Sequence, residues 1–231
     1  KEYFELIEKR KNKMPIKYIL GETEFMGLDF NVEEGVLIPR GDTEILVEEV
    51  LSIINEEDEL NVCDLCSGSG AIGISIANYR KKINVEEIDF YEVPEKVTKK
   101  NIIKHGLESR VKFIKSDLLK EPINQGKKYD VIVSNPPYIK ADEISNLMDD
   151  VKKYEPHTAL DGGDDGLVFY KRIIEESKTT LNNEGVLAFE IGYDQGEEVS
   201  NLMKEAGFYN IKLVKDLAGL DRVVLGYFKY W

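Results

Sequence analysis

The stretch "DLCSGSGAIG", residues 64–73, decides the fold class, because it connects a short apolar run to a helical pattern through closely spaced glycines. Gly68, Gly70 and Gly73 match the spacing G-x-G-x-x-G, and Asp89 follows about 20 residues later, at the end of the next apolar run. A strand that turns tightly into a helix in this way is typical of open α/β sheets that bind a nucleotide at the carboxyl ends of their strands.

Three alternatives explain this glycine loop. A dinucleotide fingerprint has the same spacing, with the downstream acid on a ribose hydroxyl. An S-adenosylmethionine (AdoMet) site uses the same geometry, since backbone N–H groups meet the ligand at the turn. A tight turn without a ligand requires that both the glycine spacing and Asp89 be accidental. Asp64 favours AdoMet slightly, because a carboxylate there is attracted to a cationic sulfonium and would repel a pyrophosphate.

An alternation of strands and helices extends from this loop to the C-terminus. Helical patterns from about Ala71 and over 94–106, 166–181 and 196–207 separate most of the apolar runs. The seven predicted strands are 61–65, 85–90, 111–116, 129–134, 185–192, 209–216 and 222–230. Such alternation builds a mainly parallel sheet with helices on both faces. The predicted fold class is therefore α/β and Rossmann-like, and the last strand is antiparallel because the link before it is too short for a parallel crossover.

Two further segments border this alternating region. Upstream, "EFMGLDFNV" (24–32) predicts a short β-hairpin, and the spacing of apolar residues over 42–54 predicts a helix with Asp42 or Thr43 as its N-cap. Downstream of the fourth strand, the long polar stretch 139–166 is a candidate lid or substrate loop.

Composition narrows the classes of function. The net charge is −13, from 44 acidic and 31 basic residues, which disfavours a long nucleic-acid backbone as the main partner. We expect no membrane span, because no apolar stretch approaches the ~20 residues that a bilayer requires. Cys63 and Cys66 are too few for a disulfide framework and fit a reducing cytoplasm, although their C-x-x-C spacing leaves a redox role as an alternative.

No metal site is predicted from the sequence. "DGGDDG" (161–166) lacks the ligand spacing of a calcium loop, and a turn before the next helix explains it better. His105 and His157 have no partners at ligand spacing. Glu190, at the end of the fifth predicted strand, lies near the ligand edge of the sheet, where a structural and a functional role are both open.

The tetrapeptide "NPPY", residues 135–138, follows the fourth predicted strand and points to the chemistry. Proline fixes φ and has no N–H, and it also holds the preceding residue extended, so the segment is stiff. It presents two acceptors, the side-chain oxygen of Asn135 and the carbonyl of Pro136, beside the flat ring of Tyr138. Two acceptors match the two hydrogens of a planar –NH2 group. Accepting both hydrogens orients the nitrogen towards a methyl donor and stabilises the charge that develops on it.

An ordinary Pro-Pro turn at the end of a strand is the alternative interpretation of this segment. Together with the glycine loop and Asp89, the tetrapeptide favours a methyl transfer site instead. A hydride-transfer enzyme has no use for such a clamp, so the dinucleotide alternative weakens.

Taken together, these motifs resemble class I AdoMet-dependent methyltransferases that modify planar amino nitrogens. Segments 15–48 (containing "VLIPRGDTE"), 154–174 and 216–226 ("DLAGLDRVVLG") resemble the release factor glutamine methyltransferase family in particular. The resemblance runs from about Pro15 to Gly226. It implies methyl transfer from AdoMet, with S-adenosylhomocysteine as product, to the side-chain amide nitrogen (N5) of the glutamine in the Gly-Gly-Gln motif of class 1 peptide chain release factors, in translation termination.

The resemblance also implies roles for individual positions. The substrate amide clamp falls on Asn135, Pro136, Pro137 and Tyr138, and Arg40 of "IPR" is expected to shape the substrate cleft, unless it forms a structural ion pair with an acid such as Glu44. The cofactor-binding positions implied are Cys66, Ser67, Gly68, Ser69, Gly70, Asp89, Leu118 and Asn135.

The chain departs from the family pattern in several places. Cys66 stands where the family usually has glycine, Glu86 and Glu87 interrupt a strand that is normally apolar, and His157 replaces a frequent arginine. The family's N-terminal helical domain is expected to be represented by residues 1–14 alone. We therefore divide the chain into this remnant, a linker with the hairpin (15–40) and a methyltransferase domain (41–231), and expect a cytoplasmic monomer.

Two rival functions remain open at this point. An adenine-N6 DNA methyltransferase shares the NPPY tetrapeptide, but the acidic composition and the lack of a basic recognition segment disfavour it. A protein that binds AdoMet without catalysing transfer is the other, because Cys66 and the missing N-terminal helices could each impair turnover.

Overall fold

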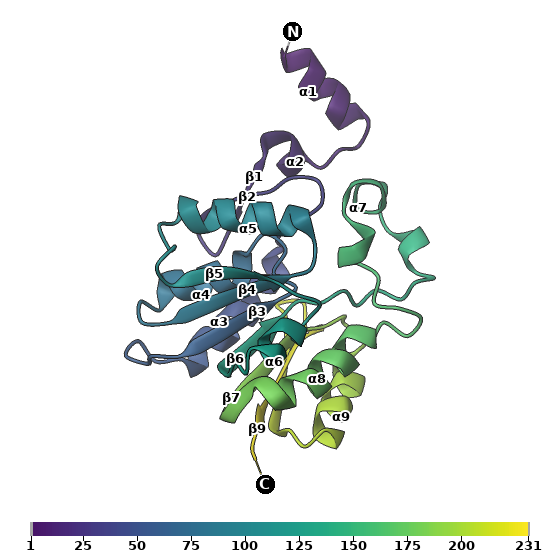
Figure 1. Cartoon of the computed structure of the whole chain (residues 1–231). Coiled ribbons are helices and arrows are strands. Elements are labelled where there is room, and N and C mark those ends of the chain that lie inside the picture. The colour runs from purple at the N-terminus through teal and green to yellow at the C-terminus, as the bar shows by residue number, and fades with distance from the viewer. Residues whose placement is uncertain (1, 231) are drawn as a thin grey trace.

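The computed structural model describes residues 2–230 and has a seven-stranded sheet at its centre, with the order β5-β4-β3-β6-β7-β9-β8 (Figure 1). The strands are β3 Asn61–Leu65, β4 Asn84–Asp89, β5 Val111–Lys115, β6 Tyr129–Ser134, β7 Leu181–Glu190, β8 Tyr209–Lys215 and β9 Asp221–Phe228. Strands β3 to β7 pair in parallel, whereas β9 is antiparallel to both β7 and β8. The predicted α/β fold class, with its antiparallel last strand, is confirmed.

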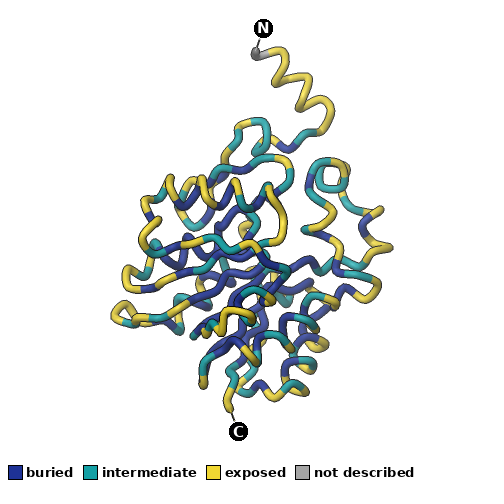
Figure 2. The backbone as a smooth tube through the Cα atoms, viewed as in Figure 1, coloured by how far each residue is buried: buried dark blue, intermediate teal, exposed yellow. Residues whose placement is uncertain are grey.

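Helices cover both faces of this sheet (Figure 1). On one face lie α3 Glu44–Ile53, α4 Ala71–Tyr79 and α5 Glu92–Lys104, and on the other lie α6 Lys120–Asn124, α8 Val168–Thr180 and α9 Gly196–Glu205. Successive side chains of a strand point to opposite faces, so Val62 of β3 joins the first apolar cluster while Cys63 and Leu65 join the second. The core is therefore two apolar layers separated by the sheet, and its buried backbone runs along the sheet in Figure 2.

The N-terminal segment consists of α1 Glu2–Lys11, α2 Ile16–Leu20 and a hairpin of β1 Glu22–Phe25 with β2 Leu28–Asn31. The hairpin is anchored on the domain, because Phe25 and Phe30 are buried in the first apolar layer and Asn31 hydrogen-bonds to Asn101 of α5. Helix α1 projects from the molecule and is largely exposed (Figures 1 and 2).

The segment between β6 and α8 carries three short helices: η2 Ile144–Asn146, α7 Asp149–Tyr154 and η3 His157–Ala159. It stands beside the sheet as a separate lobe in Figure 1. Side-chain bonds tie it to the N-terminal segment, since Lys13 pairs with Asp149 and the Tyr154 hydroxyl donates to the carbonyl of Asn12. We call residues 139–166 the lid segment.

Some boundaries differ from the sequence prediction. Strand β7 begins at Leu181 rather than at 185, because Leu181 pairs with Tyr129 across an irregularity in the register. The short helices α6 and α7 were not expected, and Pro122 lies inside α6. Among residues 2–230, every helix is too short or too polar to cross a bilayer.

Candidate active site

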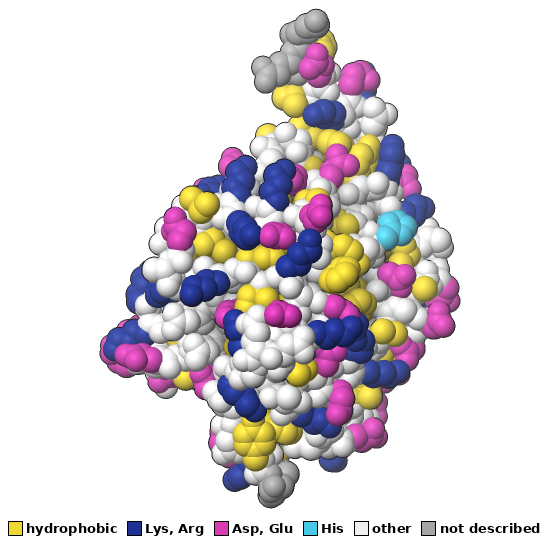
Figure 3. All heavy atoms as spheres, in the orientation of Figure 1, with side chains coloured by type: hydrophobic (Ala, Val, Ile, Leu, Met, Phe, Trp, Pro, Cys, Tyr) yellow, Lys and Arg dark blue, Asp and Glu magenta, His cyan; other side chains and the backbone are white. Residues whose placement is uncertain are grey.

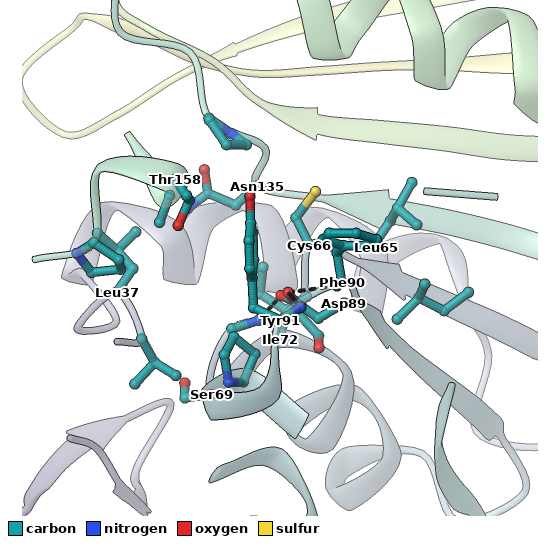
Figure 4. Close-up of a pocket in the computed structure, with 18 of the residues that line it drawn as sticks. Leu37, Leu65, Cys66, Ser69, Ile72, Asp89, Phe90, Tyr91, Asn135 and Thr158 are labelled. Carbon is teal, nitrogen blue, oxygen red and sulfur yellow. Dashed lines mark hydrogen bonds between the residues drawn. The ribbon is translucent and has the colours of Figure 1, made fainter. Parts of the chain in front are cut away.

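A cavity of about 320 Å³ lies at the carboxyl ends of β3, β4, β5 and β6 (Figure 4). Its volume falls in the range of ligand pockets, about 300–1,000 Å³. It is lined by parts of the glycine loop, of the turns after β4, β5 and β6, of the segment 35–43, of the lid segment and of α8. Nearly all the predicted cofactor positions meet here, since Cys66, Ser67, Gly68, Ser69, Asp89, Leu118 and Asn135 all line the cavity.

The glycine loop turns the chain from β3 into α4 with two glycines in the left-handed region, Gly68 (φ 57°) and Gly70 (φ 77°). Gly70 lies behind the cavity wall, and a Cβ there would stand 2.9 Å from Cγ2 of Thr98. Cys66 has a φ of 61°, a conformation that costs a non-glycine residue about 1 kcal/mol or more. The departure at position 66 therefore adds backbone strain, of a kind that is often found at functional sites.

Asp89 organises the backbone at one end of the cavity. Its carboxylate accepts hydrogen bonds from the backbone amides of Gly68 (3.0 Å), Phe90 (2.8 Å) and Tyr91 (3.2 Å), as the dashed lines in Figure 4 show in part. Burial raises the pKa of Asp89, and these three amides oppose the shift. Each carboxylate oxygen has two lone pairs, so Asp89 can still accept from a diol at the cavity surface.

Phe90 and Tyr91 line this end of the cavity although they were not predicted from the sequence. They directly follow Asp89 and are about half exposed. Leu118, which was predicted, also lines the cavity, in a left-handed conformation (φ 51°) next to Asp117. Asp117 in turn pairs with Arg172 of α8 at 2.9 Å. These apolar side chains suit a flat base, and of the residues at this end the sequence led us to expect Asp89 and Leu118 but not the two aromatic rings.

Asp64 does not lie where the sequence suggested. It is fully buried behind the glycine loop, it does not line the cavity, and its Oδ2 accepts from the amide of Gly73 at 2.8 Å. The expectation that Asp64 meets a cationic ligand group was therefore wrong. The strand direction explains the error, because Asp64 shares a sheet face with Val62 and points towards α4 rather than into the cavity.

Glu87 forms a buried carboxyl pair with Asp64. The two residues lie opposite each other in the β3–β4 register, and both are fully buried. Burial raises the pKa of Asp64 to about 6 and raises that of Glu87 well above its usual value, helped by the nearby Asp64 charge. Two adjacent buried carboxyls cannot both ionise cheaply, so the pair retains a proton. Gly73 makes room for it, because a Cβ there would stand 2.3 Å from Oε1 of Glu87.

The tetrapeptide 135–138 continues directly from the end of β6. The Ser134 hydroxyl donates to the carbonyl of Leu65 at 2.6 Å, which fixes the end of β6 beside the end of β3. Asn135 and Pro137 line the cavity, and Figure 4 shows Asn135 and Cys66 at neighbouring strand ends. Pro136 is buried and Tyr138 lies just outside the cavity wall, so the tetrapeptide brings only part of the predicted clamp into the cavity itself.

The lid segment packs closely on the backbone of Tyr138. A Cβ on Gly162 would stand 2.7 Å from the Tyr138 Cα, and one on Gly166 would stand 2.5 Å from the Tyr138 carbonyl oxygen. The side-chain amide of Gln195 donates to that same carbonyl at 3.0 Å. The glycines of "DGGDDG" therefore permit a close backbone approach. The close spacing of these glycines was visible in the sequence, but it was interpreted as an ordinary turn before the next helix.

Arg40 lies near the cavity rather than in its wall. Its guanidinium forms an ion pair with Glu155 of the lid segment, whose side chain is almost fully buried. The partner suggested by the sequence was wrong, since Glu44 instead accepts from the backbone amide of Met26. Pro156, Thr158 and Ala159, which follow Glu155, line the cavity. Arg40 thus ties the segment before α3 to the part of the lid segment that borders the cavity.

Thr43 lines the cavity as well, although the sequence analysis gave it only a capping role. It occupies the N-cap position of α3, but its side chain makes no capping hydrogen bond. The 3-10 turn Gly41–Thr43 gives it helical backbone angles (φ −67°, ψ −21°), whereas a residue whose side chain caps a helix usually has an extended backbone. Asp42 is ion-paired with Arg222 of β9.

The two cysteines are poor candidates for redox chemistry. Cys63 is fully buried, Cys66 is partly buried, and both are free thiols. Burial raises the pKa of each thiol, so neither supplies a thiolate at neutral pH. Within the described residues, no three His, Cys, Asp or Glu side chains are grouped so that they could hold a metal ion.

Comparisons with known proteins agree with this geometry. Residues 41–153 match the family model of the methyltransferase small domain. The chain is 57% identical to a release factor glutamine methyltransferase of Clostridium botulinum, over 96% of this chain and 78% of the relative. A solved protein-(glutamine-N5) methyltransferase (release factor-specific) from Alicyclobacillus acidocaldarius aligns with a TM-score of 0.54 and 29% identity, over 87% of this chain and 100% of its own.

A more distant likeness shows how widely the fold is shared. A 16S rRNA methyltransferase of T. thermophilus, solved with AdoMet and guanosine, aligns with a TM-score of 0.63 and 17% identity, over 90% of this chain and 50% of its own. At that identity only the fold is comparable. The fold therefore does not select the substrate, and the residues around the cavity have to do so.

Proposed function

Since the chain belongs to the release factor glutamine methyltransferase family, we propose that it transfers a methyl group from AdoMet to the N5 atom of the glutamine in the Gly-Gly-Gln motif of class 1 release factors. The observation that carries this proposal is the meeting of Asn135 and Pro137 with Asp89 and the glycine loop around one cavity. A nitrogen clamp and a nucleoside site that share one cavity are what methyl transfer to an amide requires.

The residues present fit AdoMet, which supplies an electrophilic methyl group on a sulfonium when bound. Asp89 has free lone pairs for the ribose hydroxyls, and the backbone of Cys66 to Ser69 can approach the ligand because Gly68 carries no side chain. Phe90 and Leu118 border the place for the adenine. Gly70 does not line the cavity, and we assign it a conformational role: its left-handed φ lets the loop turn closely past Thr98.

The chain's own contribution to the reaction is orientation and exclusion of water. We assign to the Asn135 side-chain oxygen and the Pro136 carbonyl the two hydrogens of the substrate amide, with Pro137 and Tyr138 as rigid walls. Accepting both hydrogens favours the pyramidal nitrogen, which would form the new C–N bond as the bond between the methyl carbon and the sulfonium sulfur breaks. The nitrogen would then lose one of its protons to solvent. Arg40 contributes indirectly, through Glu155, by holding the lid segment against the cavity.

The direct test is mass spectrometry of the tryptic peptide that contains the Gly-Gly-Gln motif. The purified chain is incubated with AdoMet and a class 1 release factor, and we expect the glutamine peptide to gain one methyl group. Duplex DNA with adenine targets serves as the parallel arm. Methylated adenine with an unchanged peptide would show that the chain is a DNA methyltransferase. AdoMet binding without either product would show that the chain binds AdoMet but does not catalyse methyl transfer.

Surface charge supports the protein substrate over DNA. On the face shown in Figure 3, acidic and basic side chains are interspersed rather than gathered into a basic stripe. The net charge of −13 repels a polyphosphate backbone over the whole molecule.

A further inference from the structure

Glu190 is a buried acid at the end of β7, next to the strand end that carries the amide clamp. Only 3% of its surface is exposed, and it does not line the cavity. Its Oε1 accepts a hydrogen bond from the Tyr138 hydroxyl at 3.3 Å. A buried carboxyl group costs free energy unless its neighbours satisfy it, so an acid at this position needs a reason.

The surroundings of Glu190 supply a partial charge balance. Burial raises the pKa of Glu190, and its neighbours oppose this shift in part. Arg222 of β9 favours the ionised carboxyl, although the ion pairs of Arg222 itself are with Asp216 at 3.0 Å and Asp42 at 3.4 Å. The Thr43 hydroxyl lies close enough to favour the charge too, without the geometry of a full hydrogen bond. The Tyr170 hydroxyl donates to the Glu190 backbone carbonyl at 2.9 Å and so holds the main chain, not the carboxyl.

Tyr138 is held at its two ends by different groups. Gln195 and the glycines of the lid segment fix its backbone, as described above. At the ring end, the hydroxyl meets the Glu190 carboxyl. A tyrosine side chain can rotate about two torsion angles, so a fixed backbone does not determine the direction of the ring. The hydrogen bond to Glu190 restricts this rotation.

We infer that Glu190 is a positioning residue for methyl transfer, and that its carboxyl group acts through the Tyr138 hydroxyl to fix the ring as one wall of the substrate amide site. This inference rests on the proposed function. Two parts of the chain then hold Tyr138. The rigid proline segment holds its backbone, and Glu190 at the end of β7 sets the direction of its ring.

The test compares E190A, E190Q and Y138F, with Y129F as the matched control, because it removes a buried tyrosine hydroxyl from the Glu86 carboxyl at the opposite end of β6. We expect E190A to lower kcat about tenfold or more, because small misplacements near the reacting atoms are costly, while KM for the release factor changes less and the Kd of AdoMet stays within about twofold. E190Q keeps an acceptor and should recover most of kcat. Y129F should lower the melting temperature and leave kcat unchanged.

Two further measurements keep the inference falsifiable. In a Y138F background, E190A should add little to the loss of kcat, and an equal additional loss would overturn the inference. The Tyr138 ring resonances of 13C-labelled protein, assigned by comparison with Y138F, should shift or broaden in E190A and not in Y129F. This second readout needs no turnover, so an unchanged Tyr138 signal refutes the inference even if the proposed reaction itself fails. If E190A does not fold, Y138F carries the test, because it removes the hydroxyl through which Glu190 is inferred to act. A Y138F enzyme with full kcat refutes the inference.

Discussion

The two ends of the cavity are built in different ways. At the cofactor end, the glycine loop and Asp89 meet through local chain geometry, since both lie at the ends of adjacent parallel strands. At the substrate end, the rigid segment 135–138 is supported by residues far along the chain, such as Gly166 and Gln195. The comparison teaches that the proposed cofactor site is a local property of a motif, whereas the proposed substrate site depends on contacts with residues far along the chain.

The largest effect is expected from N135A, which removes one of the two acceptors proposed for the amide. Loss of an oriented group of this kind typically lowers kcat about 10²–10³-fold. The Kd of AdoMet should rise only modestly in isothermal titration, because Asp89 and the glycine loop remain. N146A, in the exposed part of the lid segment, is the control. An N135A enzyme with normal turnover would remove the clamp from the site.

The D89N substitution perturbs the other end of the cavity, where we propose that AdoMet binds. It removes the charge that accepts from three backbone amides, and we expect the Kd of AdoMet to rise about 10–100-fold, since hydrogen bonds to charged groups contribute about 1.5–3 kcal/mol. At saturating AdoMet, kcat should be nearly normal. Titration calorimetry with D29N as the exposed control checks this. Equal losses of kcat in N135A and D89N would show that the two ends are not separable.

G166A perturbs the support of the substrate end without touching either ligand site. The new Cβ would meet the Tyr138 carbonyl at 2.5 Å, in a residue with a φ of 71°. We expect kcat to fall about tenfold, as Tyr138 is displaced, while AdoMet binds nearly normally. Gly207 is a good control, because it has a φ of 94° and open space around it, so G207A reports backbone strain alone. Similar turnover in both variants would exclude the contact with Tyr138 as the cause.

The smallest effect concerns the pH dependence of stability at the cofactor end. The pKa values of Asp64 and Glu87 are raised on folding, so the folded protein binds more protons than the unfolded chain, whose carboxyls titrate near pH ~4. The contribution of this pair is therefore most favourable at low pH and is lost as the pH rises through about 6 and beyond.

E87Q tests this assignment in urea unfolding experiments. We expect E87Q to match the original chain at pH 6, because a protonated Glu87 and a glutamine are both uncharged groups of similar size beside Asp64. At pH 9 the variant should be more stable by about 1–2 kcal/mol, since it avoids the second buried charge. E48Q, at an exposed position of α3, controls for net charge. An identical pH profile for both chains would mean that the pair is not the titrating unit.

The features that could be predicted from the sequence are those that depend on residues close together in the chain. The fold class, the glycine loop, Asp89 and the neighbourhood of Asn135 were accessible, because each depends on periodicity or on a motif within a few residues of a strand end. Asp64 was misplaced because a motif does not tell to which face of the sheet a side chain points. That direction depends on the strand's register within the sheet.

The rest of the site depends on contacts between distant parts of the chain. The ion pair of Arg40 with Glu155 spans 115 positions, so a nearer acid, Glu44, was the natural but wrong expectation. The bond between Tyr138 and Glu190 spans 52 positions and needs β6 and β7 to be neighbours. Such pairs become visible only when the sheet order is known.

The close fit around Gly73 constrains how this chain can change. A methyl group at position 73 would stand 2.3 Å from Oε1 of Glu87 and 2.8 Å from Cγ1 of Val85, so an alanine there requires both side chains to shift. Replacing Glu87 with a shorter residue removes the first of these contacts and leaves the second. In related chains, a side chain at position 73 should therefore accompany smaller residues at both 85 and 87.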